Sequence, residues 1–235
     1  MSGHDTRFSV VMATFNRADL LARAAHTVLS QHHTDVELVI VDDASTDDTA
    51  AAVQALDDPR VRYLRLDENG ERGHARNVGV AAATGDYVGF LDSDDTLYPH
   101  HFSRAAALVD LHGRPPWLHL GYDMRDGDRV VAVVDDLDGD VRDRLIRVGN
   151  LFSIAGVVLR KDVADAHPFL EDRLLAGFGE DYELWLRIAA RHPVVAAPDV
   201  TSSVHLHGGR SMTTATADEL RERSAAFLTA ALADP

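Results

Sequence analysis

Three carboxylates follow a short apolar run in the stretch YVGFLDSDDT, residues 87–96. Asp92, Asp94 and Asp95 lie within four residues of one another, and like charges so close together repel. A divalent cation would neutralise this repulsion, and oxygen-only ligands favour Mg²⁺ or Mn²⁺. Because Mg²⁺ keeps coordination positions open for substrate phosphates, the stretch predicts a site for a metal ion and a phosphate. A single aspartate, in contrast, is more often a helix cap or a turn residue.

Two further acidic pairs stand where a strand ends or a helix begins. Asp42 and Asp43 directly follow the apolar run VELVIV, and Glu180 and Asp181 precede the helical pattern YELWLRIA. Polar side chains at such positions can bind a ligand or act in catalysis. Glu180 and Asp181 can equally be favourable charges in the first turn of a helix, so the residues alone leave both interpretations open.

The segment SVHLHGGRSMT carries two histidines at alternate positions. If this segment is extended, His205 and His207 share one side and can form a pair of metal ligands. A single histidine is more often structural than a metal ligand. The pair by itself is therefore weak support for a metal site.

These side chains need a scaffold, and the first half of the chain has the pattern of alternating strands and helices. Short connections between them imply a parallel sheet covered on both faces, and ligands of such sheets collect at the carboxyl ends of the strands. Ser45 is the expected N-cap of one helix. The expected strands cover residues 7–15, 36–41, 61–66 and 86–91, and the expected helices cover residues 16–31, 45–56 and 73–83.

The second half is expected to contain a hairpin and two helices. The acidic segment 123–144 is rich in turn residues and predicts a solvated hairpin and connection, with acceptor binding as the minor alternative. One helix is expected to follow Gly179. The other, over residues 214–235, is amphipathic and is expected to cover the sheet or to pair with another chain in a homo-oligomer.

The composition disfavours several classes of protein. The chain has 235 residues, 46% of them apolar, which suffices for a large domain with its own core. A net charge of −15 disfavours binding to nucleic-acid phosphates. No window approaches the roughly 18 to 20 apolar residues of a membrane span, and the absence of cysteine fits a reducing compartment. The sequence therefore predicts a soluble, cytoplasmic protein with no membrane span and no nucleic-acid partner.

Four motifs, in this order and spacing, resemble the family 2 glycosyltransferases of GT-A fold: SVVMATFNR, VIVDDASTDDT, GHARNVGVAAATGDYVGFLDSDD and GFGEDYELWLR. The resemblance runs from about Phe8 to Thr213. It implies an α/β fold with a Rossmann-like, mostly parallel sheet flanked by helices, and an antiparallel, acceptor-side part towards the C-terminus. The implied single domain, residues 1–235, divides into a nucleotide-binding half (about 1–97), an acceptor and catalytic half (about 98–213) and a C-terminal helix (214–235).

The resemblance also implies roles for individual residues. Asp94 is the principal metal ligand, Asp92 lies nearer the ribose or the metal waters, and Asp181 is the general base. His207 matches a C-terminal histidine that reaches the metal or the diphosphate, whereas His205 stands where the family often has arginine, which leaves its role open. The other implied donor-binding residues are Thr14, Phe15, Asp43, Arg76, Asn77 and Ser93.

The implied reaction is the inverting transfer of a sugar from a nucleotide diphosphate to an acceptor hydroxyl. Mn²⁺ or Mg²⁺ on Asp94 would stabilise the departing diphosphate, and Asp181 would take the proton of the attacking hydroxyl. Asp43 can accept a hydrogen bond from an imide N–H, which favours a UDP- or dTDP-sugar as donor. The acceptor would be a saccharide, a lipid-linked molecule or a small molecule that carries a hydroxyl.

Two other classes fit part of the sequence. An apolar strand followed by DxDx[TV] also occurs in haloacid-dehalogenase-like phosphatases, where Asp92 would be the phosphorylated nucleophile and Asp94 the acid/base. That motif normally lies near the N-terminus, Lys161 is the single lysine of the chain, and DDAS and GEDYELWLR stay unexplained. The third class is a nucleotide-sugar-binding protein without turnover, and the presence of both Asp94 and Asp181 argues against it.

Overall fold

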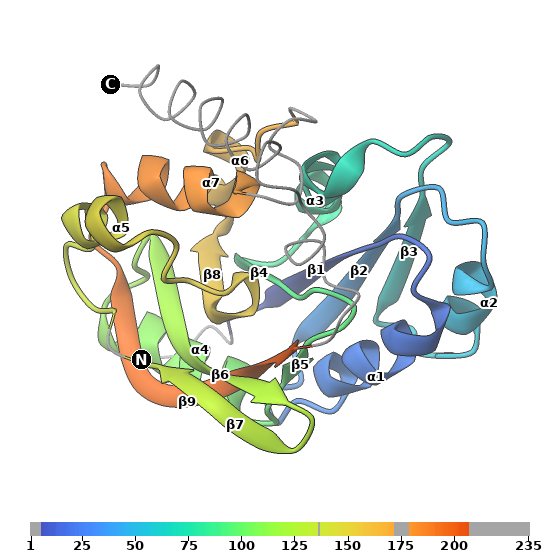
Figure 1. Cartoon of the computed structure of the whole chain (residues 1–235), viewed down its shortest axis with the longest axis horizontal. Helices are drawn as coiled ribbons and strands as arrows, with labels where there is room; N and C mark the ends of the chain where they lie inside the picture. The colour runs from blue at the N-terminus through green and yellow to red at the C-terminus, as the bar shows by residue number, and fades with distance from the viewer. Residues whose placement is uncertain (1–5, 136, 172–178, 207–235) are drawn as a thin grey trace.

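Among the residues that the structure describes, nine strands form one sheet with helices on both of its faces (Figure 1). The computed structural model describes residues 6–135, 137–171 and 179–206. The predicted α/β fold class is confirmed by this arrangement.

Four parallel strands form the first half of the sheet, in the order β3-β2-β1-β4. β1 pairs with β2 and β4, and β2 pairs with β3. All residues of β2 and β4 are buried, because helices cover both faces of these strands. Their bounds are β1 (Phe8–Thr14), β2 (Val36–Asp42), β3 (Val61–Arg65) and β4 (Tyr87–Phe90).

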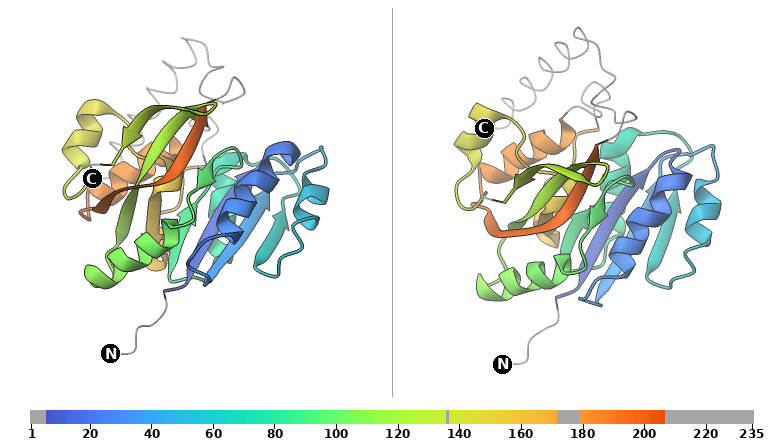
Figure 2. Two further views of the ribbon diagram at one scale, coloured as in Figure 1. Left: turned by 90° about the horizontal axis from the view of Figure 1, so that it is seen from below. Right: turned by 60° about the horizontal axis from the view of Figure 1, so that its bottom comes forward.

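The second half of the sheet adds the predicted antiparallel part. β8 (Val157–Arg160) pairs antiparallel with β4 and with β6 (Trp117–Asp126). β9 (Val195–Leu206) runs parallel to β6, and β5 (Thr96–Leu97) pairs antiparallel with β9. These strands curl away from the plane of the parallel strands (Figure 2). β6 and β7 (Arg129–Val134) form a hairpin whose second strand is exposed, in agreement with the solvated hairpin expected from the acidic segment.

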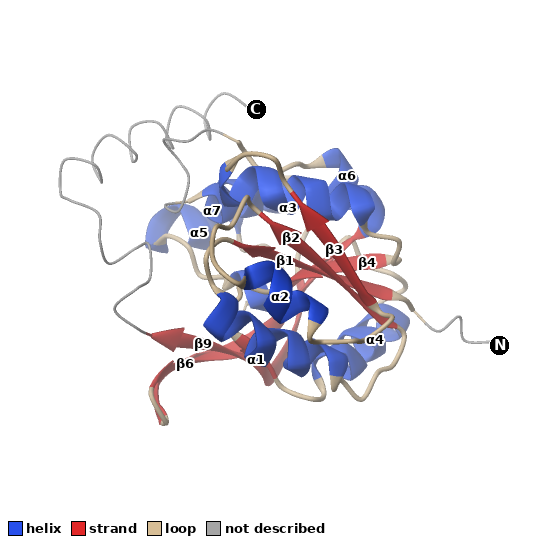
Figure 3. Cartoon of the chain, turned by 90° about the vertical axis from the view of Figure 1, so that its right-hand side faces the viewer, coloured by secondary structure: helices blue, strands red, loops and turns tan. Residues whose placement is uncertain are grey.

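Helices cover the two faces of the sheet (Figure 3). One face carries α1 (Ala18–Leu29), α2 (Thr49–Gln54) and α4 (His101–Leu111), and the opposite face carries α3 (Glu71–Ala82), α6 (Lys161–Ala166) and α7 (Glu180–Ala189). Two short elements, α5 (Arg142–Val148) and the 3₁₀ helix η1 (Ile154–Gly156), lie between β7 and β8 in the chain. α1 shows why these segments are helical: Leu21, Ala24, Ala25 and Val28 are buried at helical spacing.

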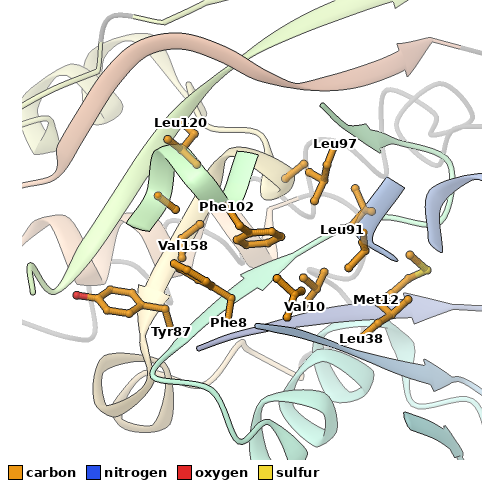
Figure 4. Packing of buried hydrophobic residues seen from close by; sticks show 14 of the residues in the cluster. Phe8, Val10, Met12, Leu38, Tyr87, Leu91, Leu97, Phe102, Leu120 and Val158 are labelled. Carbon is orange, nitrogen blue, oxygen red and sulfur yellow. The ribbon is translucent and has the colours of Figure 1, made fainter. Parts of the chain in front are cut away.

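Two clusters of buried side chains hold the layers together. On the face of α1 and α4, Phe8 from β1 packs against Phe102 from α4, with ring centroids 5.0 Å apart (Figure 4). On the opposite face, Trp117 from β6 packs beside Trp185 from α7 at 6.4 Å. The second cluster matters for the site because it fixes α7, whose first residues are Glu180 and Asp181.

Two predicted features differ from the structure. Ser45 was expected to cap a helix, but α2 begins at Thr49. The Ser45 hydroxyl instead accepts a hydrogen bond from the Asn16 backbone N–H, 2.9 Å away, so it joins the loops after β1 and β2. The expected helix over residues 73–83 begins two residues earlier, at Glu71.

Other expectations fall beyond what the structure covers. His207 and the C-terminal helix, residues 214–235, lie outside the described residues, and so does the expected oligomer contact through that helix. Within the described part of the chain, none of the helices has the length and apolar character needed to cross a membrane.

Candidate functional site

A pocket of about 270 Å³ opens at the carboxyl ends of β1, β2 and β4, next to the start of α3. This is where ligands of parallel α/β sheets are expected. Six of the predicted site residues meet in this pocket, although they come from three separate strand ends. Its lining consists of Ala13, Thr14, Phe15, Arg17, Asp43, Asn69, Glu71, Arg72, Ala75, Asp92, Ser93 and Asp94.

The end of β1 offers the pocket a hydroxyl and an aromatic ring. The Thr14 hydroxyl oxygen is buried and has no hydrogen-bond partner among the described residues. A buried polar atom without a partner is costly, so this oxygen is suited to a ligand. The Phe15 side chain follows directly and is 44% exposed, which leaves its ring available for stacking.

Asp42 and Asp43 are neighbours with different surroundings. Asp42 is fully buried, and its carboxylate accepts hydrogen bonds from the Ser45 N–H at 2.8 Å and the Tyr63 hydroxyl at 2.5 Å. Asp43 lines the pocket, and its Oδ1 accepts the Gly70 N–H at 2.8 Å. Within the described part of the chain, Asp43 Oδ2 accepts no hydrogen bond, so this oxygen can accept one from a ligand. Asp42 therefore stabilises the loop, and Asp43 faces the pocket.

Asp92, Asp94 and Asp95 form the acidic cluster at the end of β4, and each offers a carboxylate oxygen within 4.8 Å of the others. Asp92 accepts a hydrogen bond from Arg76, and Asp95 Oδ1 accepts the backbone N–H of His205 at 2.9 Å. Asp94 lines the pocket and is half-buried. An oxygen-only donor set of this size fits Mg²⁺ or Mn²⁺, with Asp92 and Asp94 on the pocket side.

Arg76 connects this cluster to α7. Its side chain is 3% exposed, and its guanidinium donates to Asp92 Oδ1 at 2.9 Å and to Glu180 Oε1 at 2.8 Å. The guanidinium also lies over the Phe169 ring, 5.3 Å from its centroid. Arg76 was predicted to contact the donor, but it is absent from the pocket lining. In this structure it joins two acidic residues that are far apart in the sequence.

Asp181, the predicted base, stands at the start of α7. It is half-buried, its Oδ1 accepts the Tyr182 N–H at 2.7 Å, and its Oδ2 accepts the Asn150 amide at 3.2 Å. Burial and the neighbouring charge of Glu180 raise the pKa of Asp181 to about 6, and Arg76 opposes this rise. A carboxylate with a pKa near 6 can take a proton at neutral pH and is suited to general base catalysis.

Asn77 and His205 lie close to the site but outside the pocket lining. The Asn77 amide donates to the Phe169 carbonyl at 2.9 Å and to Glu171 at 2.8 Å, and its oxygen accepts the Phe169 N–H. Asn77 thus holds the segment that leads to α7. His205 Nε2 forms a hydrogen bond with the Thr96 hydroxyl at 3.0 Å, and burial lowers the pKa of its ring.

Sequence reasoning missed several residues of the site. The sequence left the role of Glu180 open, with a favourable charge in the first helical turn as one interpretation, and gave it no place in the site; it is 3% exposed and paired with Arg76. Asn150, which donates to Asp181, had no recognisable signal because it lies in a connecting segment. Asn69 could have been found, since it follows β3 and therefore stands at a carboxyl strand end.

Comparison with known proteins identifies relatives of this architecture. Residues 9–114 match the family model "Glycosyl transferase family 2". The chain is 46% identical over 103 residues to the succinoglycan biosynthesis protein ExoO of Rhizobium meliloti, a match that covers 44% of this chain and 30% of that protein. The chain spans about half or less of the length of the first curated relatives that it matches.

Two solved structures share the fold. S. aureus TarS 1-349 in complex with UDP superposes with a TM-score of 0.73 at 21% identity, covering 95% of this chain and 65% of that one. The mannosyltransferase PcManGT of Pyrobaculum calidifontis, in complex with GDP-Man and Mn²⁺, superposes with a TM-score of 0.68 at 22% identity, covering 97% and 63%. The predicted GT-A fold agrees with these neighbours.

Proposed function

We propose that this chain, whose residues 9–114 match the model of glycosyl transferase family 2, transfers a sugar from a nucleoside diphosphate to an acceptor hydroxyl, with inversion at the anomeric carbon. The observation that carries the proposal is the pocket in which Thr14, Asp43 and Asp94 meet. Arg76 joins the pocket residue Asp92 to Glu180, the neighbour of Asp181 in the chain. The pocket supplies donor binding, and Asp181 supplies the base.

The nucleotide base would bind at the ends of β1 and β2. Asp43 Oδ2 would accept an imide N–H, the Thr14 hydroxyl would bond to the nucleotide, and the exposed Phe15 ring would stack on the base. This chemistry favours UDP or dTDP, because uracil and thymine both carry an imide N–H. TarS binds UDP and PcManGT binds GDP-Man, so guanosine donors belong in the test.

Asp94 would hold a Mn²⁺ or Mg²⁺ ion, with Asp92 and Ser93 nearer the ribose. His207, which lies outside the described residues, is a further candidate ligand of the metal or the diphosphate. A divalent cation bound there would supply Lewis-acid stabilisation of the negative charge on the leaving diphosphate. Asp92 accepts a hydrogen bond from Arg76, and Asp95 accepts the His205 backbone N–H. Asp94 lines the pocket, which supports it as the principal ligand.

Asp181 would act on the acceptor. Its carboxylate takes the proton of the attacking hydroxyl while the new C–O bond forms on the face of the sugar opposite the diphosphate. The bond from the anomeric carbon to the diphosphate breaks, and its electron pair leaves with the diphosphate oxygen. In this scheme, residues 1–97 bind the donor and residues 98–213 receive the acceptor, which is a saccharide, a lipid-linked molecule or a small molecule with a free hydroxyl.

The test combines donor binding with turnover. UDP-, dTDP- and GDP-sugars are screened with Mn²⁺ for binding, and release of the nucleotide is measured with water and with a panel of hydroxyl acceptors. Asp181→Asn should keep donor affinity near wild type and lower turnover by about 10²- to 10⁴-fold, the usual effect of losing a positioned base.

Asp143→Asn is the matched control, because Asp143 is an exposed acidic residue in the first turn of α5. This variant should behave as wild type in both assays. Full turnover by Asp181→Asn would overturn the base assignment. Release of phosphate from an aryl phosphate, abolished by Asp92→Asn, would support the phosphatase class instead.

A further inference from the structure

Glu180 and Asp181 are adjacent carboxylates in opposite environments. Glu180 is 3% exposed and its Oε1 accepts a hydrogen bond from Arg76. Asp181 is only half-buried and is bound by the weaker donors Asn150 and the Tyr182 N–H. Because an enclosed, ion-paired carboxylate cannot reach an acceptor hydroxyl, Glu180 is unsuited to be the base itself.

The contacts of Glu180 connect the two sides of the site. Arg76 NH1 lies 2.8 Å from Glu180, and Arg76 NH2 lies 2.9 Å from Asp92. Arg72, one turn earlier on α3, places its Nε 3.7 Å from the same Glu180 oxygen. Through Arg76, the first turn of α7 is thus tied to the end of β4, which carries Asp92 and Asp94.

This connection matters for the proposed reaction, because Asp181 and the carboxylates at the end of β4 must act on opposite sides of one sugar. A base displaced by about 1 Å can lower the rate by about 10²-fold. Arg76 makes one charge-assisted hydrogen bond to each of the two carboxylates, and such bonds are stronger than neutral ones. Arg76 is further held over the Phe169 ring. The negative charge of Glu180 also lies next to Asp181 and is one of the causes of its raised pKa.

We propose that Glu180 is a positioning residue: through Arg76 it holds the first turn of α7, and with it Asp181, at a fixed distance from Asp92 and Asp94. This inference rests on the proposed transferase function. It assigns to Glu180 a role that differs from a first-turn helix charge, since the side chain points to Arg76 and not to solvent.

Glu180→Gln tests the proposal, because it keeps an oxygen acceptor for Arg76 and removes the charge. We expect kcat for nucleotide release from the donor found in the screen to fall about 10- to 100-fold, as for other residues that orient a catalytic group, with KM for the donor nearly unchanged. The acid limb of the kcat/KM profile should move to lower pH, because Asp181 loses a negative neighbour.

Glu183→Gln is the matched control. Glu183 is also buried on α7 and paired with an arginine, Arg187, at 2.6 Å, but it does not contact Arg76. Loss of this charge should lower the melting temperature and leave kcat and the pH profile unchanged. A second variant, Glu180→Asp, keeps the charge and shortens the reach, so kcat should fall while the acid limb stays near its wild-type position.

The outcomes separate this inference from the proposed function. Wild-type kcat and pH profile in Glu180→Gln would overturn the positioning role, even if Asp181→Asn is inactive. Full turnover in Asp181→Asn would overturn the transferase mechanism itself. If Glu180→Gln does not fold, Arg76→Lys serves instead: lysine keeps the charge but cannot span both carboxylates, so it should lower kcat, and an unchanged kcat would overturn the proposal.

Discussion

Asp181 should control how activity depends on pH. Its pKa is raised to about 6 by burial and by Glu180, and a general base works only when deprotonated. We expect kcat/KM to fall about tenfold per pH unit below pH 6 and to be flat above it, since kcat/KM reports the groups of the free enzyme. The measurement is kcat/KM between pH 4.5 and 8.5. A limb near pH 4 would mean that Asp181 is solvated like an ordinary aspartate.

His119 should make the fold sensitive to acid. Its ring is fully buried against Phe152, and neither ring nitrogen has a hydrogen-bond partner among the described residues. Burial lowers the pKa of His119 to about 3, so the folded state resists protonation. The unfolded chain binds a proton at His119 below its usual pKa of about 6.5, whereas the folded chain keeps the ring neutral. The folded state therefore has its full stability above this pH and loses stability as the pH falls below it.

His119→Leu should therefore remove part of this acid sensitivity. When the pH is lowered from 8 to 5, the difference in unfolding free energy between the variant and the wild type should shift by about 1 to 2 kcal/mol in favour of the variant, because each unit of pKa shift corresponds to about 1.4 kcal/mol. Denaturant unfolding of both proteins at the two pH values gives the comparison. The same difference in stability at pH 8 and pH 5 would show that His119 is protonated as readily in the folded chain as in the unfolded one.

At the scale of single elements, the packing of α3 against the sheet matters for the site because α3 carries Arg76. Gly79 faces β1, and a Cβ atom there would lie 2.3 Å from Val11 Cγ1 and 3.2 Å from Val41 Cγ2. The helix can lie so close to the sheet only because this residue has no side chain. That close approach brings Arg76 within reach of Asp92 at the end of β4.

Gly79→Ala should lower the free energy of unfolding by about 1 to 3 kcal/mol, the usual cost of overpacking, although alanine is the better helix former by about 1 kcal/mol. Thermal or denaturant unfolding measures this change, and nucleotide release should fall as well because α3 moves. Unchanged or increased stability would mean that α3 shifts without strain.

The individual elements were largely predictable from local pattern. Apolar runs such as VELVIV and the helical spacing in α1 indicated the correct types of element. The N-cap at Ser45 was wrong because a distant partner, the Asn16 backbone, takes its hydroxyl. Local preference therefore determined the element type, while a tertiary contact determined where α2 begins.

At the scale of the whole molecule, charge should make donor binding depend on a metal ion. The chain carries a net charge of −15, and Asp43, Asp92 and Asp94 line the pocket in which the anionic donor would bind. Like charges oppose this binding unless a cation lies between them. UDP affinity should fall at least about tenfold when Mn²⁺ is removed with a chelator.

Calorimetric titration of UDP with and without Mn²⁺ measures the effect. Asp94→Ala should bind UDP weakly in both conditions, whereas Asp110→Ala, on the exposed side of α4 and outside the pocket, should behave as wild type. Equal UDP affinity of the wild type in both conditions would remove the metal from the donor site.

The sequence by itself determined the alternating elements, the positions of the acidic motifs at strand ends and the family resemblance, because these depend on residues that are near one another in the chain. Only the tertiary structure decided the surroundings of each member of the two acidic pairs: Asp43 lines the pocket whereas Asp42 is buried away from it, and Asp181 is half-buried whereas Glu180 is buried and paired with Arg76. The reason is physical. Burial and ion pairing of a carboxylate depend on partners that are distant in the chain, as in the bond from Arg76 to Glu180 across 104 residues. Such contacts cannot be inferred from the local sequence pattern.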